Sequence, residues 1–336
     1  MTRMPEAAPR RLHWPKPDRF TLSLIGTVLL ASFLPARGGF APLVDHVGRA
    51  AIFLLFFLHG AMLSRQAVVE SLGRWKLHLG VLAATFILFP LIGLALRPVS
   101  GRLIAPELYT GILFLCCLPS TVQSSIAFTS IARGNVPVAI CAASASSLIG
   151  IVVTPLLTGL LLARQSGVSL DAVGSIVATI LLPFALGQLV HSRIGAWLRA
   201  RKPLTGLVDR GSVLIMVYAA FGKAVIEGIW HSVSVGDLVM LILLCMFILA
   251  VVMILLLRLS RLAGLARPDE IAFFFCGSKK SLVSGVPMAS VLFPGPAAGA
   301  IVLPLMIFHQ IQLIACAFIA RAYERAAIAG EGQRLC

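Results

Sequence analysis

The sequence predicts an all-α integral membrane protein, and three observations support this prediction. Of its 336 residues, 59% are hydrophobic and 12% are charged, against roughly 25% charged residues in an ordinary soluble domain. The mean hydropathy is +0.97. Apolar runs of helical length follow one another from residue 20 to residue 323, with no polar domain between them. One membrane domain therefore accounts for almost the whole chain.

About ten runs are long enough to cross a bilayer as helices, which takes roughly 20 residues each. They lack the alternating polarity of barrel strands, so helices are the structure that satisfies their backbone in lipid. Short basic or Gly/Pro-rich connections separate them. In chain order, the predicted spans lie near Phe20–Pro35, Val47–Met62, Leu77–Leu96, Leu108–Ala132, Val136–Ala163, Ala172–His191, Leu207–Gly228, Leu238–Leu257, Glu270–Leu292 and Ala298–Arg321.

Basic residues predict which connections face the cytoplasm. They cluster before the first span, after the second, sixth and eighth spans, and after the tenth. By the positive-inside rule, these segments and both termini are cytoplasmic. The predicted organisation is a cytoplasmic tail at 1–19, a transmembrane domain at 20–323 and a cytoplasmic tail at 324–336, in the inner or plasma membrane. The net charge of +15 is dispersed among loops without a binding module, which argues against nucleic acid as a partner.

The fourth and ninth predicted spans each contain a break. In LPSTVQSSIAFTS, Pro119 removes a backbone donor in mid-span, and polar groups stand where lipid-facing leucines would be expected. The polar groups there are Ser120, Thr121, Gln123, Ser124 and Ser125. The ninth span repeats the arrangement in FFFCGSKKSLVSGVPM, with Gly277, Ser278, Lys279, Lys280 and Ser281.

The two breaks lie five spans apart, so the second half of the chain is predicted to be inverted relative to the first. Paired interrupted spans are typical of secondary transporters with inverted repeats, whose broken helices meet near the midplane and form the substrate site. The predicted fold is two inverted five-helix repeats with helices four and nine crossing at their breaks. Ser144, Ser147 and Thr154 on the fifth span, with His309 and Gln312 on the tenth, are expected to line the cavity behind the crossing. Simple helix-to-helix hydrogen bonding or packing is the alternative for each of them.

The adjacent lysines allow three interpretations. Each costs roughly 2.5–3.5 kcal/mol at the centre of a spanning helix, so Lys279 and Lys280 must face protein or water. Their ammonium groups donate to carbonyls that the break leaves unpaired, or at least one lies in an aqueous cavity and attracts an anion or replaces a coupling cation. A hydrolase dyad with Ser278 or Ser281 is the third interpretation. Adjacent residues cannot easily aim at each other and no oxyanion site is evident, so no enzyme is predicted.

Two smaller expectations concern charge and metal binding. Lys223 and Glu227, four residues apart near the outer end of the seventh span, are expected to form an ion pair. The seven cysteines lack metal-ligand spacing with histidines and are expected to serve as small packing residues.

Five stretches carry a resemblance to a known family: LLFFLHGAMLSR, LPSTVQSSIAFTSIARGN, LLPFALGQLV, FCGSKKSLVSG and LPLMIFHQIQL. They resemble the bile acid:sodium symporter superfamily, solute carrier family ten, and within it the SBF-like branch that includes the seventh member. The resemblance runs from the first to the tenth span. It implies a panel domain of spans 1, 2, 6 and 7 and a core domain of spans 3–5 and 8–10.

The resemblance also implies two sodium ions behind the crossing, with ligands near Ser124 and Ser125 and further hydroxyls from Ser144 and Ser147. The ninth span departs from the family pattern Glu-x-Gly-x-Gln-Asn. Phe275 stands in place of the acid, and the two lysines stand in place of the amides. Two positive charges would repel sodium at this position.

The expected function is secondary active transport of a small organic, anionic solute, by alternating access around the crossing of helices four and nine. Family resemblance implies sodium coupling, so Na⁺ is the candidate coupling ion and no other cofactor is expected. The expected partners are the lipid bilayer and the organic anion, and a homo-oligomer is left open. The alternatives are a non-transporting membrane regulator of ion flux or of a partner protein, and a sodium-independent, proton-coupled carrier.

Overall fold

The computed structural model describes residues 19–62, 75–99, 102–166, 170–226, 228, 233–293 and 297–334, and the regular elements of this part are helical. The predicted N-terminal tail, apart from Arg19, and the predicted ion-pair partner Glu227 lie outside it. The elements are α1 (Arg19–Phe33), α2 (Phe40–Met62), α4 (Trp75–Ala83), the π-helix η2 (Ala84–Leu88), α5 (Phe89–Ala95), the 3-10 helix η3 (Arg97–Val99), α6 (Pro106–Cys117), α7 (Val122–Ile131), α8 (Val136–Ser166), α9 (Leu170–Ala200), α10 (Lys202–Ile226), α12 (Val235–Leu262), α13 (Arg267–Gly277), α14 (Leu282–Leu292) and α15 (Ala297–Arg334).

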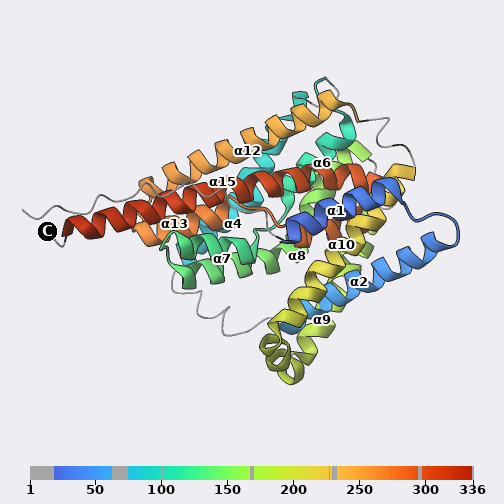
Figure 1. Ribbon diagram of the computed structural model, residues 1–336, viewed down its shortest axis with the longest axis horizontal. Helices are drawn as coiled ribbons and strands as arrows, with labels where there is room; N and C mark the ends of the chain where they lie inside the picture. Colours follow the sequence, from blue (N-terminus) through green and yellow to red (C-terminus); the bar gives the residue numbers. More distant parts are fainter. Residues whose placement is uncertain are drawn as a thin grey trace, which may run out of the picture.

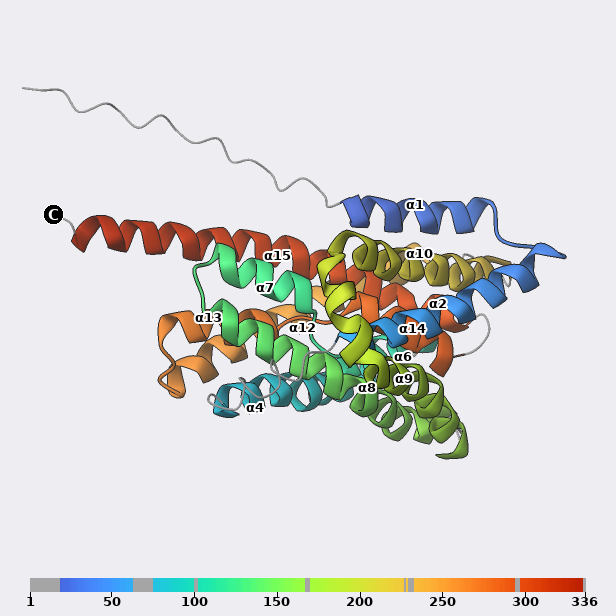
Figure 2. The same ribbon diagram turned by 90° about the horizontal axis from the view of Figure 1, so that it is seen from below.

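The predicted all-helical membrane class is confirmed for the described residues. Six helices are long and apolar enough to cross a membrane, and a seventh span is counted if α6 and α7, which are bent by 64°, form one broken helix. α15 continues past the predicted domain boundary at residue 323 and ends at Arg334. Figure 2 shows α15 extending past the rest of the helices at its C-terminal end.

The helices pack in two groups (Figure 1). α1, α2, α9 and α10 form one group, and α4 to α8 with α12 to α15 form the other. α2 and α9 approach closely because glycines face the partner backbone: a Cβ on Gly187 would lie 2.0 Å from the carbonyl oxygen of Phe57. Small residues at such crossings allow helices to pack tightly in membranes. Contacts of α10 with α14 and α15 join the two groups.

An ion pair joins α2 to α10. The ammonium nitrogen of Lys223 lies 2.7 Å and 2.8 Å from the two carboxylate oxygens of Asp45, which is 178 residues distant in sequence. The sequence of the seventh span alone does not contain this partner. The predicted pair of Lys223 with Glu227 stays a prediction, because Glu227 lies outside the described residues.

The start of α12 and its buried side both follow from its local sequence. Its N-terminus is closed by a capping box, in which the Ser234 hydroxyl accepts from the Asp237 amide and the Asp237 carboxylate accepts from the Ser234 amide. Leu241 and Ile248 are fully buried against neighbouring helices, whereas Leu243 is exposed. An exposed apolar side of this kind suits lipid rather than water.

Both predicted breaks are present. α6 ends at Cys117 and α7 begins at Val122, while α13 ends at Gly277 and α14 begins at Leu282. Four residues at each place leave the helical hydrogen-bond pattern. At the second break the Ser281 hydroxyl accepts from the amide of Ser284 and so begins α14.

Candidate functional site

The two breaks contact each other and form a crossover, defined here as residues 118–121 and 278–281. The Ser281 amide donates to the Pro119 carbonyl at 2.9 Å. In the opposite direction, the Thr121 hydroxyl donates to the Lys280 carbonyl at 2.8 Å. Segments about 160 residues apart are therefore joined directly through their unwound backbones.

Hydroxyl groups satisfy the carbonyls that the breaks leave without helical partners. A helix end leaves its last four carbonyls unpaired, and burial makes an unpaired carbonyl costly. At the end of α13, Ser125 donates to the Phe275 carbonyl at 3.2 Å and Ser120 donates to the Cys276 carbonyl at 2.6 Å. The broken fourth span thus supplies the donors that complete the ninth.

In the opposite direction, Lys280 of the ninth span donates hydrogen bonds to unpaired carbonyls of the fourth span. Its side chain is 0% exposed, and its ammonium nitrogen donates to the carbonyls of Cys116 at 2.8 Å, Leu118 at 2.7 Å and Thr85 at 2.8 Å. Three donors meet three acceptors, so the group is fully hydrogen-bonded. The ring of Phe89 lies 4.1 Å away. Because the C-terminal end of a helix carries partial negative charge, the end of α6 also favours a cation here.

The carbonyls of Thr85, Cys116 and Leu118 form a cage around the ammonium group of Lys280. The Thr85 carbonyl can accept this hydrogen bond because of the π-helix η2. In a π turn the Phe89 amide donates to the Ala84 carbonyl, so it does not serve Thr85. The next residue that could serve Thr85 is Pro90, which has no N–H. The Thr85 carbonyl therefore has no intrahelical donor and is bound by the lysine instead.

Gln312 on α15 fixes the backbone of the crossover. Its carbonyl oxygen accepts from the Lys280 amide at 2.9 Å, and its amide nitrogen donates to the Lys280 carbonyl at 2.9 Å. The same nitrogen lies 3.0 Å from the Nδ1 of His309, which accepts from it in the corresponding tautomer. Gln312 is fully buried and His309 nearly so. These two residues position the unwound segment.

Lys279 has a different environment from its neighbour. It is also 0% exposed, but its ammonium nitrogen has no hydrogen-bond partner among the described residues. It lies 3.9 Å from the ring centroid of Phe128 and 5.7 Å from that of Phe275. Aromatic faces attract a cation, although they do not replace oxygen acceptors. Lys279 is thus the cation of the crossover whose hydrogen-bonding capacity is not used.

These contacts bear on the three interpretations of the lysines. Lys280 follows the first, because it donates to carbonyls at the break. Neither ammonium group contacts a serine hydroxyl, which removes the basis for a hydrolase dyad with Ser278 or Ser281. The aqueous cavity of the second interpretation is not found at the lysines in this conformation, since both are completely buried.

A family model, described as the SBF-like CPA transporter family, matches residues 18–325. The chain belongs to this family. Its members are transporters, so the prediction that the chain is not an enzyme is confirmed, and a lipid bilayer and a small solute are its partners.

The relatives of this SBF-like CPA transporter include bacterial and vertebrate proteins. An uncharacterized protein of Pseudomonas aeruginosa is 55% identical, covering 92% of this chain and 93% of the relative. The Escherichia coli protein named "Putative symporter YfeH" is 50% identical over the same shares. The Xenopus tropicalis sodium/bile acid cotransporter 7 is 30% identical and covers 88% of each chain.

Several predicted site residues of this SBF-like CPA transporter lie away from the crossover. Gln123 is exposed. Ser144 and Ser147 are half-buried, and the α8 hydroxyl that contacts the break belongs to Ser146, which accepts from the Ser120 amide at 3.0 Å. Thr154, the third residue predicted on this face of α8, does contact the end of α6. Ser124 is half-buried, and its hydroxyl oxygen has no partner in the described part of the chain.

The face of α8 that contacts the break could have been found from a four-residue spacing. Ser146, Gly150 and Thr154 recur at this interval. A Cβ on Gly150 would lie 2.6 Å from the Pro119 ring, and the Thr154 hydroxyl donates to the Cys117 carbonyl at 2.8 Å. No comparable sequence pattern pointed to Thr85, because its carbonyl is free to bind Lys280 only as a result of the π turn.

The donor set at the crossover of this transporter does not fit a sodium ion. Carbonyl oxygens that could bind one are occupied by the ammonium group of Lys280. The Ser125 hydroxyl is used as a donor to Phe275. The acid nearest in sequence, Glu270, pairs with Arg267 at the start of α13. Among the described residues, no group of three or more His, Cys, Asp or Glu side chains could hold a metal.

Proposed function

We propose that the chain is a secondary active transporter of a small organic anion that works by alternating access. Its ten spans would form two inverted five-helix repeats, with α1, α2, α9 and α10 as the panel and the remaining helices as the core. The reciprocal hydrogen bonds of the two broken spans support this proposal, because paired broken helices are typical of such carriers. The panel then moves against a core that the crossover holds together.

The observation that carries the proposal is the carbonyl cage around Lys280. A cation at the crossing of two broken helices neutralises the partial negative charge of a helix end, which is the electrostatic task of a coupling ion. Here the cation is covalently attached and makes three hydrogen bonds. The carrier therefore needs no sodium at this position.

Lys279 supports a second part of the proposal, the coupling mechanism. An ammonium group without oxygen acceptors is unfavourable in a dry interior, so it gains from pairing with an anion or from giving up its proton. A lysine that changes partner or proton during the cycle can couple solute movement to a proton gradient. We propose this role for Lys279 and a fixed, structural role for Lys280.

Uptake into liposomes tests whether transport requires sodium. Vesicles containing the full chain are given a mixture of amphipathic carboxylates and sulfonates with an inward proton gradient, in matched sodium and potassium buffers. At least one anion is expected to accumulate above protein-free vesicles, equally in both buffers, as mass spectrometry of the washed vesicles measures. Accumulation that requires sodium would refute the role given to Lys280. No accumulation of any compound would favour a non-transporting regulator.

The proposed orientation places both termini and the 193–210 segment in the cytoplasm of a cell with this protein in its plasma membrane. The clustering of basic residues on these segments supports it. A single cysteine placed at Pro203 is expected to resist a membrane-impermeant thiol reagent in intact cells and to react after permeabilisation. A cysteine placed at Arg102 should react in both cases. Equal labelling of Pro203 before and after permeabilisation contradicts the orientation.

A further inference from the structure

The exposed side of α9 changes from apolar to basic along the helix. Its exposed residues recur every three or four positions, so they form one stripe. Leu182, Leu186 and Leu189 are the large side chains of the first part of this stripe, within the sixth predicted span. Arg193 and Trp197 continue the stripe toward the C-terminal end of the helix, and both are exposed. One helix face therefore joins an apolar surface to a basic and aromatic one.

Arg201 completes the basic and aromatic end of the stripe. It follows the last residue of α9, and its guanidinium carbon lies 3.9 Å from the centroid of the Trp197 ring. Stacking of this kind uses the flat face of the guanidinium group and leaves the N–H groups at its edge available. Neither Arg193 nor Arg201 forms a hydrogen bond or an ion pair through its guanidinium group with any residue that the structure describes. Two sets of planar donors are thus available beside one indole ring.

The charge of this part of the chain is strongly positive. Between residues 172 and 208 the sequence contains no Asp or Glu, whereas it contains four Lys or Arg residues: Arg193, Arg199, Arg201 and Lys202. The acid that follows, Asp209, lies 3.4 Å from the Nε2 of His59 on α2. The two arginines of the stripe therefore have no neutralising carboxylate from their own helix.

We propose that this surface binds an anionic phospholipid, with the phosphate between Arg193 and Arg201 and an acyl chain along the three leucines. Guanidinium groups match phosphate oxygens through paired hydrogen bonds. Tryptophan is enriched at the level of lipid headgroups, where Trp197 would lie at the end of its span. Basic clusters next to a membrane span attract anionic headgroups. This inference does not depend on the proposed transport function.

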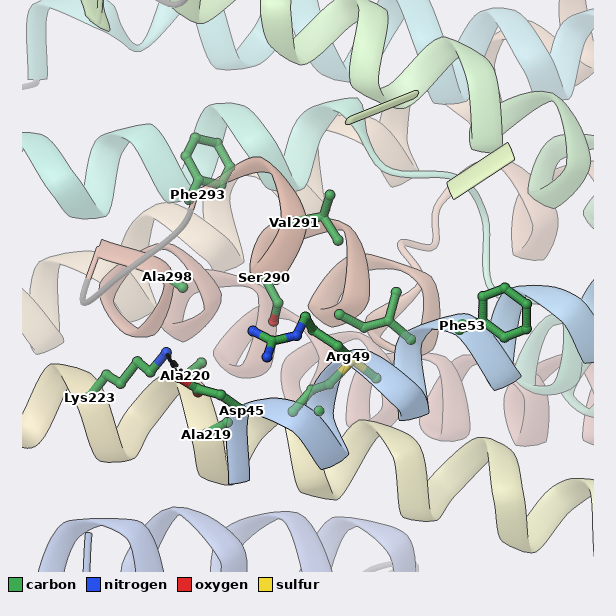
Figure 3. A pocket seen from close by; sticks show the side chains of 13 residues that line it. Asp45, Arg49, Phe53, Ala219, Ala220, Lys223, Ser290, Val291, Phe293 and Ala298 are labelled. Atoms are coloured by element: carbon green, nitrogen blue, oxygen red, sulfur yellow. Dashed lines mark hydrogen bonds and ion pairs between the residues drawn. The ribbon is translucent and has the colours of Figure 1, made fainter. Parts of the chain in front are cut away.

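The position of the surface favours a lipid over other occupants. The three leucines belong to a predicted span, so a water-soluble protein does not reach them. A zwitterionic lipid would bring a cation of its own beside two arginines, whereas an anionic lipid brings none. Figure 1 shows the turn between α9 and α10 at the lower edge of the molecule, where a bilayer lipid can approach it. The cavity of about 420 Å³ between α2, α10, α14 and α15 (Figure 3) is a different place, since its described lining includes no residue of α9.

Quenching of Trp197 fluorescence by brominated lipids tests this surface. The full chain, with its three other tryptophans replaced by phenylalanine, is reconstituted in equimolar phosphatidylcholine and phosphatidylglycerol. The acyl chains of one lipid or of the other carry the bromine atoms. Brominated phosphatidylglycerol is expected to quench at least about twofold more strongly than brominated phosphatidylcholine, because the arginines select its headgroup. High salt should reduce this difference, since it screens exposed charges.

The variant Arg193→Gln/Arg201→Gln is expected to make the two lipids quench equally. Arg321→Gln/Arg325→Gln is the matched control, because it removes two exposed arginines from α15 and should keep the difference. Size-exclusion chromatography verifies that each variant is folded. Equal quenching by the two lipids in the chain with both α9 arginines would overturn the inference without any charge variant. A difference that survives Arg193→Gln/Arg201→Gln, or one that the control pair removes to the same extent, would also overturn it.

Discussion

Replacing Lys280 with methionine is expected to destabilise the folded chain severely, whereas the same change at the adjacent Lys279 leaves the fold intact. Lys280→Met keeps an apolar stem of similar length but removes the ammonium group from the cage. Three buried carbonyls, those of Thr85, Cys116 and Leu118, then have no donor. Each buried acceptor left without a donor costs about 1–3 kcal/mol, so the three together account for a severe loss.

Lys279→Met is the matched comparison for this result. Its ammonium group gives no hydrogen bond to any described residue, and the ammonium nitrogen lies 3.9 Å from the ring centroid of Phe128. Replacing an unpaired buried charge with an apolar group of similar volume is typically neutral or stabilising. Thermal unfolding in detergent, followed by size-exclusion chromatography, measures both variants. Equal losses in the two variants, or a Lys280→Met protein as stable as the unmodified chain, would contradict the assignment of the cage.

The second large effect concerns transport. Lys279→Met is expected to lower the uptake of the transported anion by at least about tenfold, a change of roughly 1.4 kcal/mol or more in the barrier, while the protein stays folded. The reason is that Lys279 is the crossover cation with unused hydrogen-bonding capacity, so it is available to pair with the solute or to exchange a proton. Uptake into vesicles with and without a proton gradient measures the effect.

Lys76→Met serves as the control for uptake, because it removes an exposed lysine at the start of α4. Its uptake should match that of the unmodified chain. If Lys279→Met retains the same uptake and the same response to the proton gradient as the control, Lys279 has no role in coupling. The lysine would then be a packing residue between Phe128 and Phe275.

The breaks could be predicted from sequence because their causes are local. Pro119 lacks an N–H whatever its neighbours are, and a run of polar residues within an apolar segment needs partners other than lipid. The structure has both breaks at the predicted positions. The partners of the breaks were predicted only in part. Thr154 was named and contacts the end of α6, but Ser146 was missed in favour of Ser144 and Ser147, because the exact face that a helix presents depends on packing that the segment alone does not determine.

The different roles of the two lysines also could not be predicted from their sequence. Adjacent side chains on an unwound segment point in different directions, so one reaches the end of α6 and the other reaches Phe128. The cage further requires the Thr85 carbonyl, which comes from a π turn 195 residues earlier.

The cage around Lys280 has a consequence for how the fold responds to its ionic surroundings. A dissolved ion that binds the native state stabilises it by mass action, so each tenfold dilution of a saturating ion removes about 1.4 kcal/mol of stability. An ammonium group on the chain cannot be diluted, and its occupancy of the cage is the same at every salt concentration. The contribution of the cage to the stability of the fold is therefore independent of the salt concentration around the protein.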